Sequence, residues 1–196
     1  MPVLANAIDA LLPQTQCGQC GYAACLPYAQ ALAAGECGPN RCPPGGDETL
    51  VALAGLLGQP IVPLDASCGE TMAPRQAHID SDTCIGCTKC IPACPVDAIV
   101  GASKRLHAVL TDECNGCGLC LAPCPVDCIS LLPLAAQSDP QRTARPAINR
   151  RRHQARQRRL AAHRVTEKPV PTPTRQSPEV QTALARARAL LATRRA

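Results

Sequence analysis

The chain repeats one cysteine pattern, Cys-x2-Cys-x2-Cys-x3-Cys-Pro, at an offset of thirty residues. The first copy runs from Cys84 to Pro95 and the second from Cys114 to Pro125. Three cysteines spaced by two residues can supply three thiolates to an iron–sulfur cubane from one loop, and the fourth ligand must then come from elsewhere. In bacterial two-cluster sequences of this kind, the cysteine before the proline ligates the other cluster. The pattern therefore predicts two interlocked 4Fe-4S clusters.

The repeat divides the predicted ligands into two sets, each with three cysteines from one copy and one from the other. The sets are Cys84, Cys87, Cys90 and Cys124 for one cluster, and Cys114, Cys117, Cys120 and Cys94 for the other. Cys128 falls where the first copy has Ala98, so we interpret it as a small buried apolar residue rather than a ligand. No residue pattern elsewhere predicts acid, base or nucleophilic catalysis, so the sequence leaves open whether the protein is itself an enzyme.

Two other uses of cysteine fit the repeat less well. Disulfides require an oxidising compartment, and the chain shows no charged and then apolar signal peptide. Its fifteen cysteines also cannot all pair. Structural zinc sites take four thiolates, but they usually use two Cys-x2-Cys pairs with a longer insert, which leaves the third cysteine of each copy without a role. Iron–sulfur ligation accounts for the whole spacing.

A third cysteine group near the N-terminus has a different spacing, which we interpret as another cubane site. The group consists of Cys17, Cys20, Cys25, Cys37 and Cys42. Cys42 is preferred over Cys37 as the fourth ligand because a proline follows it, as in the two repeats. Zinc stays open here, since four-cysteine zinc sites tolerate irregular inserts. Cys68 stands alone and is interpreted as inert.

Hydrophobic periodicity and chain breakers predict three helices around this third group. The expected features are an apolar stripe of Leu4, Ile8, Leu11 and Leu12 that stops at Pro13, a helix from Pro27 to Gly35, and a helix from Asp47 that stops at Gly58 with Leu50, Leu53 and Leu57 inward. The expected divisions are a helical 4Fe-4S module (residues 1–60), a linker (61–78), a two-cluster ferredoxin-like domain (79–135) and an Arg- and Pro-rich tail (136–196). The predicted fold class is α+β: a small helical 4Fe-4S module, a two-cluster ferredoxin-like module and a disordered or partly helical basic tail.

Charge separates the tail from the rest of the chain. Residues 138–196 contain 15 Lys and Arg against 3 Asp and Glu, a net charge of +12, whereas residues 1–137 contain 5 against 12, a net charge of −7. Beyond a proline-rich segment, Ser177-Pro178-Glu179 predicts a helix over 178–195. The tail could be solvated, fold back on the acidic body or bind an anionic membrane. Nucleic acid is disfavoured, because the tail has no aromatic residue for stacking on bases.

Several strings of the sequence resemble the B subunit of the Rnf ion-translocating electron transport complex. They are LPQTQCGQCGY from Leu12, NRCPPGG from Asn40, CIGCTKC from Cys84 and CPVDAIVGA from Cys94, and the resemblance covers residues 3 to about 133. It implies a third 4Fe-4S cluster on Cys17, Cys20, Cys25 and Cys42. It also implies redox partners such as ferredoxin, a flavoprotein or an NAD-linked reductase, and association with membrane subunits of a complex that moves sodium ions or protons.

Members of that family typically begin with an apolar membrane-spanning helix, and this sequence has no run of eighteen apolar residues. We therefore expect the bacterial cytoplasm, or peripheral attachment to the cytoplasmic face of the inner membrane. The favoured function is a relay of single electrons through three 4Fe-4S clusters in an Rnf-type complex. The alternative is a stand-alone ferredoxin without ion pumping. A less favoured hypothesis is a redox-responsive adaptor that binds nucleic acid or membrane through the basic tail.

Overall fold

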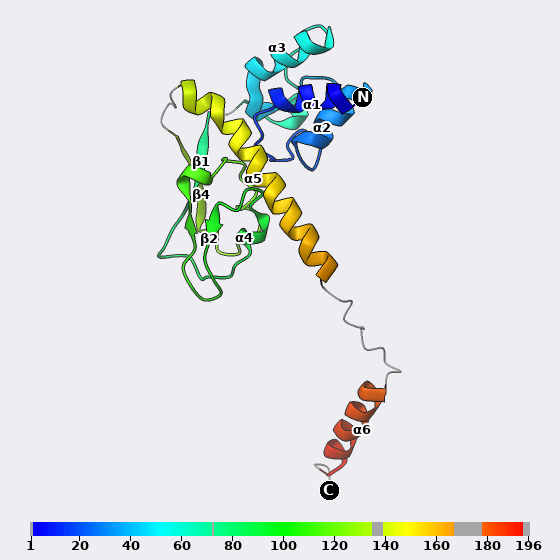
Figure 1. Ribbon diagram of the computed structural model, residues 1–196. Helices are drawn as coiled ribbons and strands as arrows, with labels where there is room; N and C mark the ends of the chain where they lie inside the picture. The colour runs from blue at the N-terminus through cyan, green and yellow to red at the C-terminus, as the bar shows by residue number, and fades with distance from the viewer. Residues whose placement is uncertain (1, 72, 135–138, 167–177, 194–196) are drawn as a thin grey trace. The chain divides into compact units, whose positions relative to one another are not determined.

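The computed structural model describes residues 2–71, 73–134, 139–166 and 178–193 (Figure 1). Residues as far as Arg158 form one compact unit, and the residues from Arg159 onward form a second. The first unit contains short helices, two small antiparallel sheets and most of one long helix. This mixture confirms the α+β fold class that the sequence predicts.

Three helices build the N-terminal part. They are α1 (Pro2–Leu11), α2 (Cys25–Ala34) and α3 (Gly46–Leu57), with short 3-10 helices at η1 (Pro43–Gly45) and η2 (Ala66–Cys68). α2 and α3 each end at a glycine with positive φ, Gly35 and Gly58, whose N–H groups bond to carbonyls of the last turn. α2 begins two residues earlier than expected, which makes Cys25 its first residue.

The core of this part lies where α1 packs on α2 and α3. Ile8, Leu12 and Leu53 are at most 1% exposed, and the ring of Tyr28 is buried among them. The predicted apolar stripe is wrong at Leu11, which is 38% exposed. Ile8 and Leu12 are one helical turn apart and share the buried face, whereas Leu11 is offset from that face by one residue of helical rotation.

The cysteine repeat folds into two short antiparallel ribbons. β1 (Arg75–Ile79) pairs with β4 (Ile129–Pro133), with Ile79 opposite Ile129. β2 (Ile99–Val100) pairs with β3 (Ala108–Val109), with Ile99 opposite Val109. The other elements are the single turn α4 (Cys90–Ala93) and the 3-10 helix η3 (Thr111–Glu113). Each ribbon therefore pairs a strand that flanks the first copy of the repeat with a strand that flanks the second.

The thirty-residue repeat extends to the backbone conformation. Gly86 and Gly116 both have positive φ, at 68° and 70°, and Asp97 and Asp127 follow at 53° and 50°. A non-glycine residue with positive φ is uncommon, so the same strained turn at equivalent positions indicates a shared requirement. The two aspartates stand three residues after the Cys-Pro cysteines Cys94 and Cys124, where they shape the turn around each sulfur.

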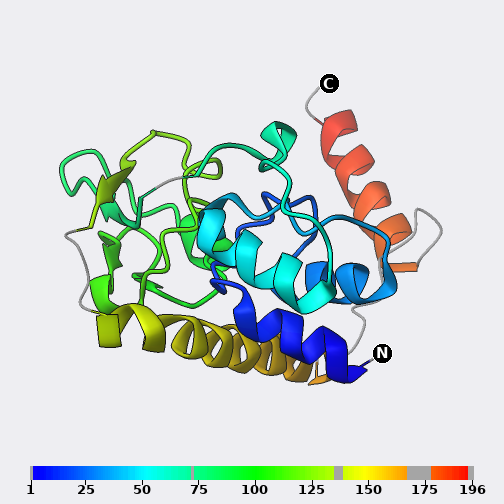
Figure 2. The same ribbon diagram turned by 90° about the horizontal axis from the view of Figure 1, so that it is seen from above.

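The basic tail contains more regular structure than a disordered extension would. α5 (Asp139–Thr166) is 28 residues long and α6 (Pro178–Thr193) is 16 residues long; the end of the helix predicted over 178–195 lies outside the described residues. In Figure 2 the first part of α5 runs along α1 and along the ribbons of the repeat. Ion pairs join it to both: Arg150 to Asp9 at 2.7 Å, Arg156 to Asp97 at 2.8 Å, and Arg152 to Glu113. Part of the tail thus folds back on the acidic body.

Candidate metal centres

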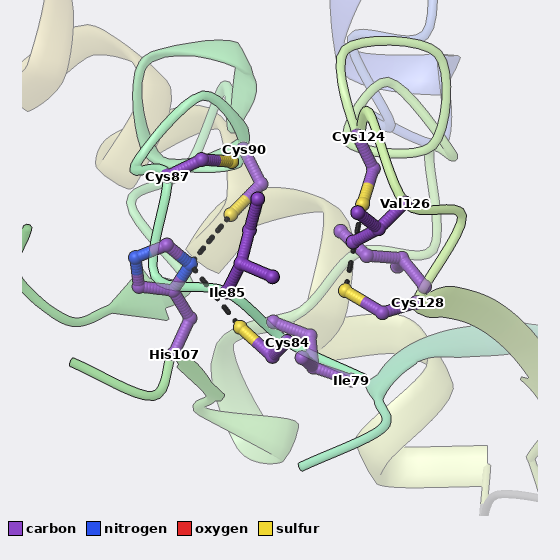
Figure 3. Close-up of a pocket in the computed structure, with 10 residues that line it drawn as sticks. Ile79, Cys84, Ile85, Cys87, Cys90, His107, Cys124, Val126 and Cys128 are labelled. Carbon is purple, nitrogen blue, oxygen red and sulfur yellow. Dashed lines mark hydrogen bonds between the residues drawn. The ribbon is translucent and has the colours of Figure 1, made fainter. Parts of the chain in front are cut away.

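The cysteines assigned to the first cluster set come together around one cavity. Cys84, Cys87, Cys90 and Cys124 all line this cavity (Figure 3). The rest of its lining is mainly aliphatic, from Ile79, Ile85, Val126 and Ile129. Three of these thiols come from one copy of the repeat and one from the other. Apolar walls of this kind exclude water, one of the factors that set a cluster's potential.

The turn after Cys124 surrounds its sulfur with hydrogen-bond donors. Burial acts to raise the pKa of this thiol, but the backbone N–H groups of Val126 and Cys128 outweigh burial and hold the pKa below its usual value. The equivalent turn in the first copy directs the N–H of Ala98 to Cys94 Sγ at 3.1 Å. Donors of this kind stabilise a thiolate, the form in which cysteine binds iron.

Sequence reasoning missed His107, which lines the same cavity. Its Nδ1 lies 3.4 Å from Cys90 Sγ and 3.9 Å from Cys84 Sγ, as the dashed lines in Figure 3 show. The ring is buried, with 6% of the residue exposed. Among the residues that the structure describes, no hydrogen-bond partner is found for Nε2 of this ring. A comparison of the two repeats could have drawn attention to it, because the equivalent position in the first copy is Ala77.

The N-terminal cysteines surround a second cavity. Cys17, Cys20, Cys25 and Cys42 all line it, together with Leu12 and Tyr28 among others. Burial raises the pKa of Cys25 and of Cys42 to about 12 in each case. Thiols with such a high pKa stay protonated at neutral pH, and they become thiolates only where a metal supplies compensating positive charge.

A buried chain of polar side chains holds the N-terminal cavity in place. Asp9 accepts a hydrogen bond from Gln14 at 2.9 Å, and Gln14 accepts one from Gln16 at 2.8 Å. Gln16 in turn accepts the N–H of Cys25 at 2.9 Å, which is the first residue of α2. Gln14 and Gln16 are 1% and 4% exposed. Both have positive φ, so local backbone strain is part of this arrangement.

In the second ligand set of the repeat, the neighbouring thiols affect the pKa of Cys117. Burial is the main cause that raises the pKa of Cys117 to about 12, and the neighbouring thiols of Cys94, Cys120 and Cys114 raise it further. The N–H of Ala77 points to Cys114 Sγ at 3.4 Å. Three members of the set are buried and Cys117 is half-buried. The four thiols therefore influence one another, although they come from both copies.

The three remaining cysteines occupy different places. Cys128 lines the cavity of Cys84 and Cys124, and its Sγ lies 3.4 Å from Cys124 Sγ. Cys37 packs at the edge of the N-terminal core, whereas Cys42 lines the cavity. Cys68 is buried in η2, and its proximity raises the pKa of the Arg41 guanidinium.

Two of the three predicted ligand sets line cavities. Within the described parts of the chain, no three His, Cys, Asp or Glu side chains come close enough to hold a single metal ion. Four cysteines line each of two cavities. A donor set of soft sulfurs in an apolar cavity fits a bulky iron–sulfur group.

Comparison with known proteins agrees with this chemistry. The family model of a 4Fe-4S dicluster domain matches residues 77–131, and the model described as "Putative Fe-S cluster" matches residues 12–44. These two matches cover the repeat and the whole N-terminal cysteine group.

Several relatives that match about two thirds or more of the chain share one name. The B subunit of the ion-translocating oxidoreductase complex of Alkalilimnicola ehrlichii is 61% identical over 132 residues, which cover 67% of this chain and 71% of the relative. The B subunit of Azoarcus sp. is 56% identical over 149 residues, or 76% of this chain and 81% of the relative. That of Thiobacillus denitrificans is 59% identical over 132 residues, or 67% and 70%. The chain belongs to the family of ion-translocating oxidoreductase complex B subunits.

Membership of the B subunit family confirms the resemblance seen in the sequence and the prediction of an iron–sulfur electron-transfer protein. The name given to these relatives makes them parts of multi-subunit complexes. In the part of the chain that the structure describes, no helix combines the length and the apolar character needed to cross a membrane.

Proposed function

We propose that the chain holds three 4Fe-4S clusters and relays single electrons through them. The ligand sets are Cys17, Cys20, Cys25 and Cys42; Cys84, Cys87, Cys90 and Cys124; and Cys114, Cys117, Cys120 and Cys94. The observation that carries the proposal is the convergence of the first two sets, each of four predicted ligands, on its own cavity. When bound, the clusters supply the one-electron chemistry; the chain supplies thiolates, N–H donors and apolar walls.

The N-terminal set and the repeat adjoin each other through the third set. Cys17 and Cys117 line one cleft, together with Thr15 and Asn115. The Asn115 side chain donates a hydrogen bond to the Thr15 carbonyl at 2.7 Å, which ties the two loops together. This contact supports a linear order: a group held by the N-terminal cysteines would lie next to one held by Cys114, Cys117, Cys120 and Cys94, whose partner in the repeat would come last.

We further propose that the chain works within an Rnf-type complex on the cytoplasmic side of the bacterial inner membrane. Its partners there would be membrane subunits and a ferredoxin, flavoprotein or NAD-linked reductase. The acidic body, with a net charge of −7 over residues 1–137, suits docking on a basic reductase surface. Arg150, Arg152 and Arg156 are used within the chain, which weighs against the tail as a free adaptor.

The test is metal analysis of anaerobically purified protein with a matched pair of variants. The full chain should contain roughly twelve irons with acid-labile sulfide, from three four-iron clusters. Cys42→Ser should lower the iron content by about four irons, whereas Cys37→Ser should leave it unchanged. Of these two cysteines, Cys42 lines the N-terminal cavity and Cys37 does not. About eight irons in the full chain, or zinc in place of iron at the N-terminus, would refute the three-cluster proposal.

A further inference from the structure

His107 occupies a site shaped for its ring beside two cluster ligands. The Nδ1 atom faces Cys90 Sγ at 3.4 Å and Cys84 Sγ at 3.9 Å (Figure 3). The ring packs against Gly101, where a Cβ would lie 2.2 Å from Cδ2 of the imidazole. Because Gly101 has no side chain, it leaves the space that the ring of His107 occupies.

The neighbours of the ring select one tautomer. A cysteine sulfur that binds iron is a thiolate, which can accept hydrogen bonds but has no proton to donate. The favourable neutral form of His107 therefore carries its proton on Nδ1. This form leaves the buried Nε2 as an acceptor, and an unpaired buried acceptor is more readily tolerated than an unpaired N–H.

The two copies of the repeat differ at this place. His107 corresponds to Ala77, and Gly101 corresponds to Leu131. Ala77 stands opposite Leu131 in the β1 and β4 pair. This ribbon therefore has a small residue at the position of His107 and a large one at the position of Gly101. On that side the donor to Cys114 Sγ is the backbone N–H of Ala77. Only the cluster on Cys84, Cys87, Cys90 and Cys124 has an imidazole at this repeat position.

We propose that His107 donates its Nδ1–H to the ligand sulfur of Cys90, shared with Cys84, and so sets the potential of this cluster above that of its twin. This inference rests on the proposed 4Fe-4S clusters. A hydrogen bond to a ligand sulfur stabilises the extra negative charge of the reduced cluster and favours reduction. Electrons that enter the pair then settle on the cluster beside His107, which makes the repeat directional. His107 is a positioning and tuning residue and takes no part in electron exchange itself.

The experiment is an electron paramagnetic resonance redox titration of the full chain, with iron counted in every sample. His107→Leu removes the donor, and His107→Asn retains an N–H near the position of Nδ1. His78→Leu removes an exposed histidine from β1 and is the control. His107→Leu should lower one midpoint potential by about 59 mV, which is a tenfold change in a one-electron equilibrium, and leave the other steps unchanged. His107→Asn and His78→Leu should stay near the wild type.

Equal shifts in His107→Leu and His107→Asn, or no shift in His107→Leu at full iron content, would overturn the role of His107 while leaving the three clusters intact. A full chain without iron would instead overturn the proposed function. Should both His107 variants lose iron, pulsed spectra of reduced wild-type protein labelled with ¹⁵N-histidine decide the matter. They should show a coupled histidine nitrogen, and its absence would refute the hydrogen bond.

Discussion

Arg150 of α5 forms an ion pair with Asp9 of α1 at 2.7 Å, between residues 141 positions apart. Its guanidinium also donates a hydrogen bond to the Asp9 carbonyl. Asp9 is the first member of the buried polar chain that reaches the N–H of Cys25. A residue of the basic tail is thereby connected to a candidate ligand of the N-terminal cluster.

Arg150→Ala should weaken the N-terminal site, because it leaves the largely buried Asp9 carboxylate without its charge partner. We expect a loss of about 1–3 kcal/mol in the free energy of unfolding. Denaturant unfolding and the rate of iron release to a chelator would measure it. Arg151→Ala is the matched control, since Arg151 is exposed on the same helix. Equal effects of the two variants would show that the ion pair adds nothing.

Gln16→Leu should destabilise the N-terminal cluster without affecting the repeat. The substitution leaves the N–H of Cys25 and the side-chain oxygen of Gln14 without their partners, at a cost of about 1–3 kcal/mol for a buried group. Iron release should become biphasic, with about four irons lost early. Gln30→Leu, at an exposed position of α2, should behave as the wild type. Release of all irons at one unchanged rate would contradict the prediction.

Cys128→Ala should retain every cluster, because the first copy of the repeat has alanine at this position. The change removes a thiol 3.4 Å from Cys124 Sγ, so a small change in the spectrum of one cluster is expected. Cys124→Ala should cost about four irons under the same conditions, by loss of one ligand. Iron and sulfide analysis compares the two. Iron loss in Cys128→Ala together with full iron content in Cys124→Ala would make Cys128 the ligand in place of Cys124.

Gly101→Ala should reproduce the effect of His107→Leu without a change to His107 itself. The new Cβ would overlap the imidazole, so the ring must move away from Cys90 and Cys84. The potential of one cluster should therefore fall, while the iron content holds. Gly55→Ala is the control, because no other atom lies within 4 Å of a Cβ at that helical position. It should raise stability by about 0.5–1 kcal/mol and leave all potentials unchanged.

The sequence was most informative where function depends on short spacing. The Cys-x2-Cys-x2-Cys runs are local, so their arrangement around a common cavity could be anticipated without knowledge of the fold. His107 was missed because its partner Cys84 is 23 residues away and histidine has many uses. The comparison of Ala77 with His107, and of Leu131 with Gly101, contained the signal, but its meaning depends on the ribbon that brings these positions together.

α5 could not be located from sequence for a related reason. It contains many arginines and an internal proline, Pro146, and such a segment resembles a solvated extension. Its docking depends on carboxylates and carbonyls of distant segments, including Asp9, Glu113 and the carbonyl of Pro92. Local propensity carries no information on such partners.

The arginines of α5 are synthesised after all of the cysteines. All fifteen cysteines precede α5, since the last of them is Cys128. Domains fold from the N-terminus during synthesis, so both cysteine regions leave the ribosome before the helix that joins them. The ion pairs from α5 to Asp9 and Glu113 therefore form only after every candidate ligand has been synthesised.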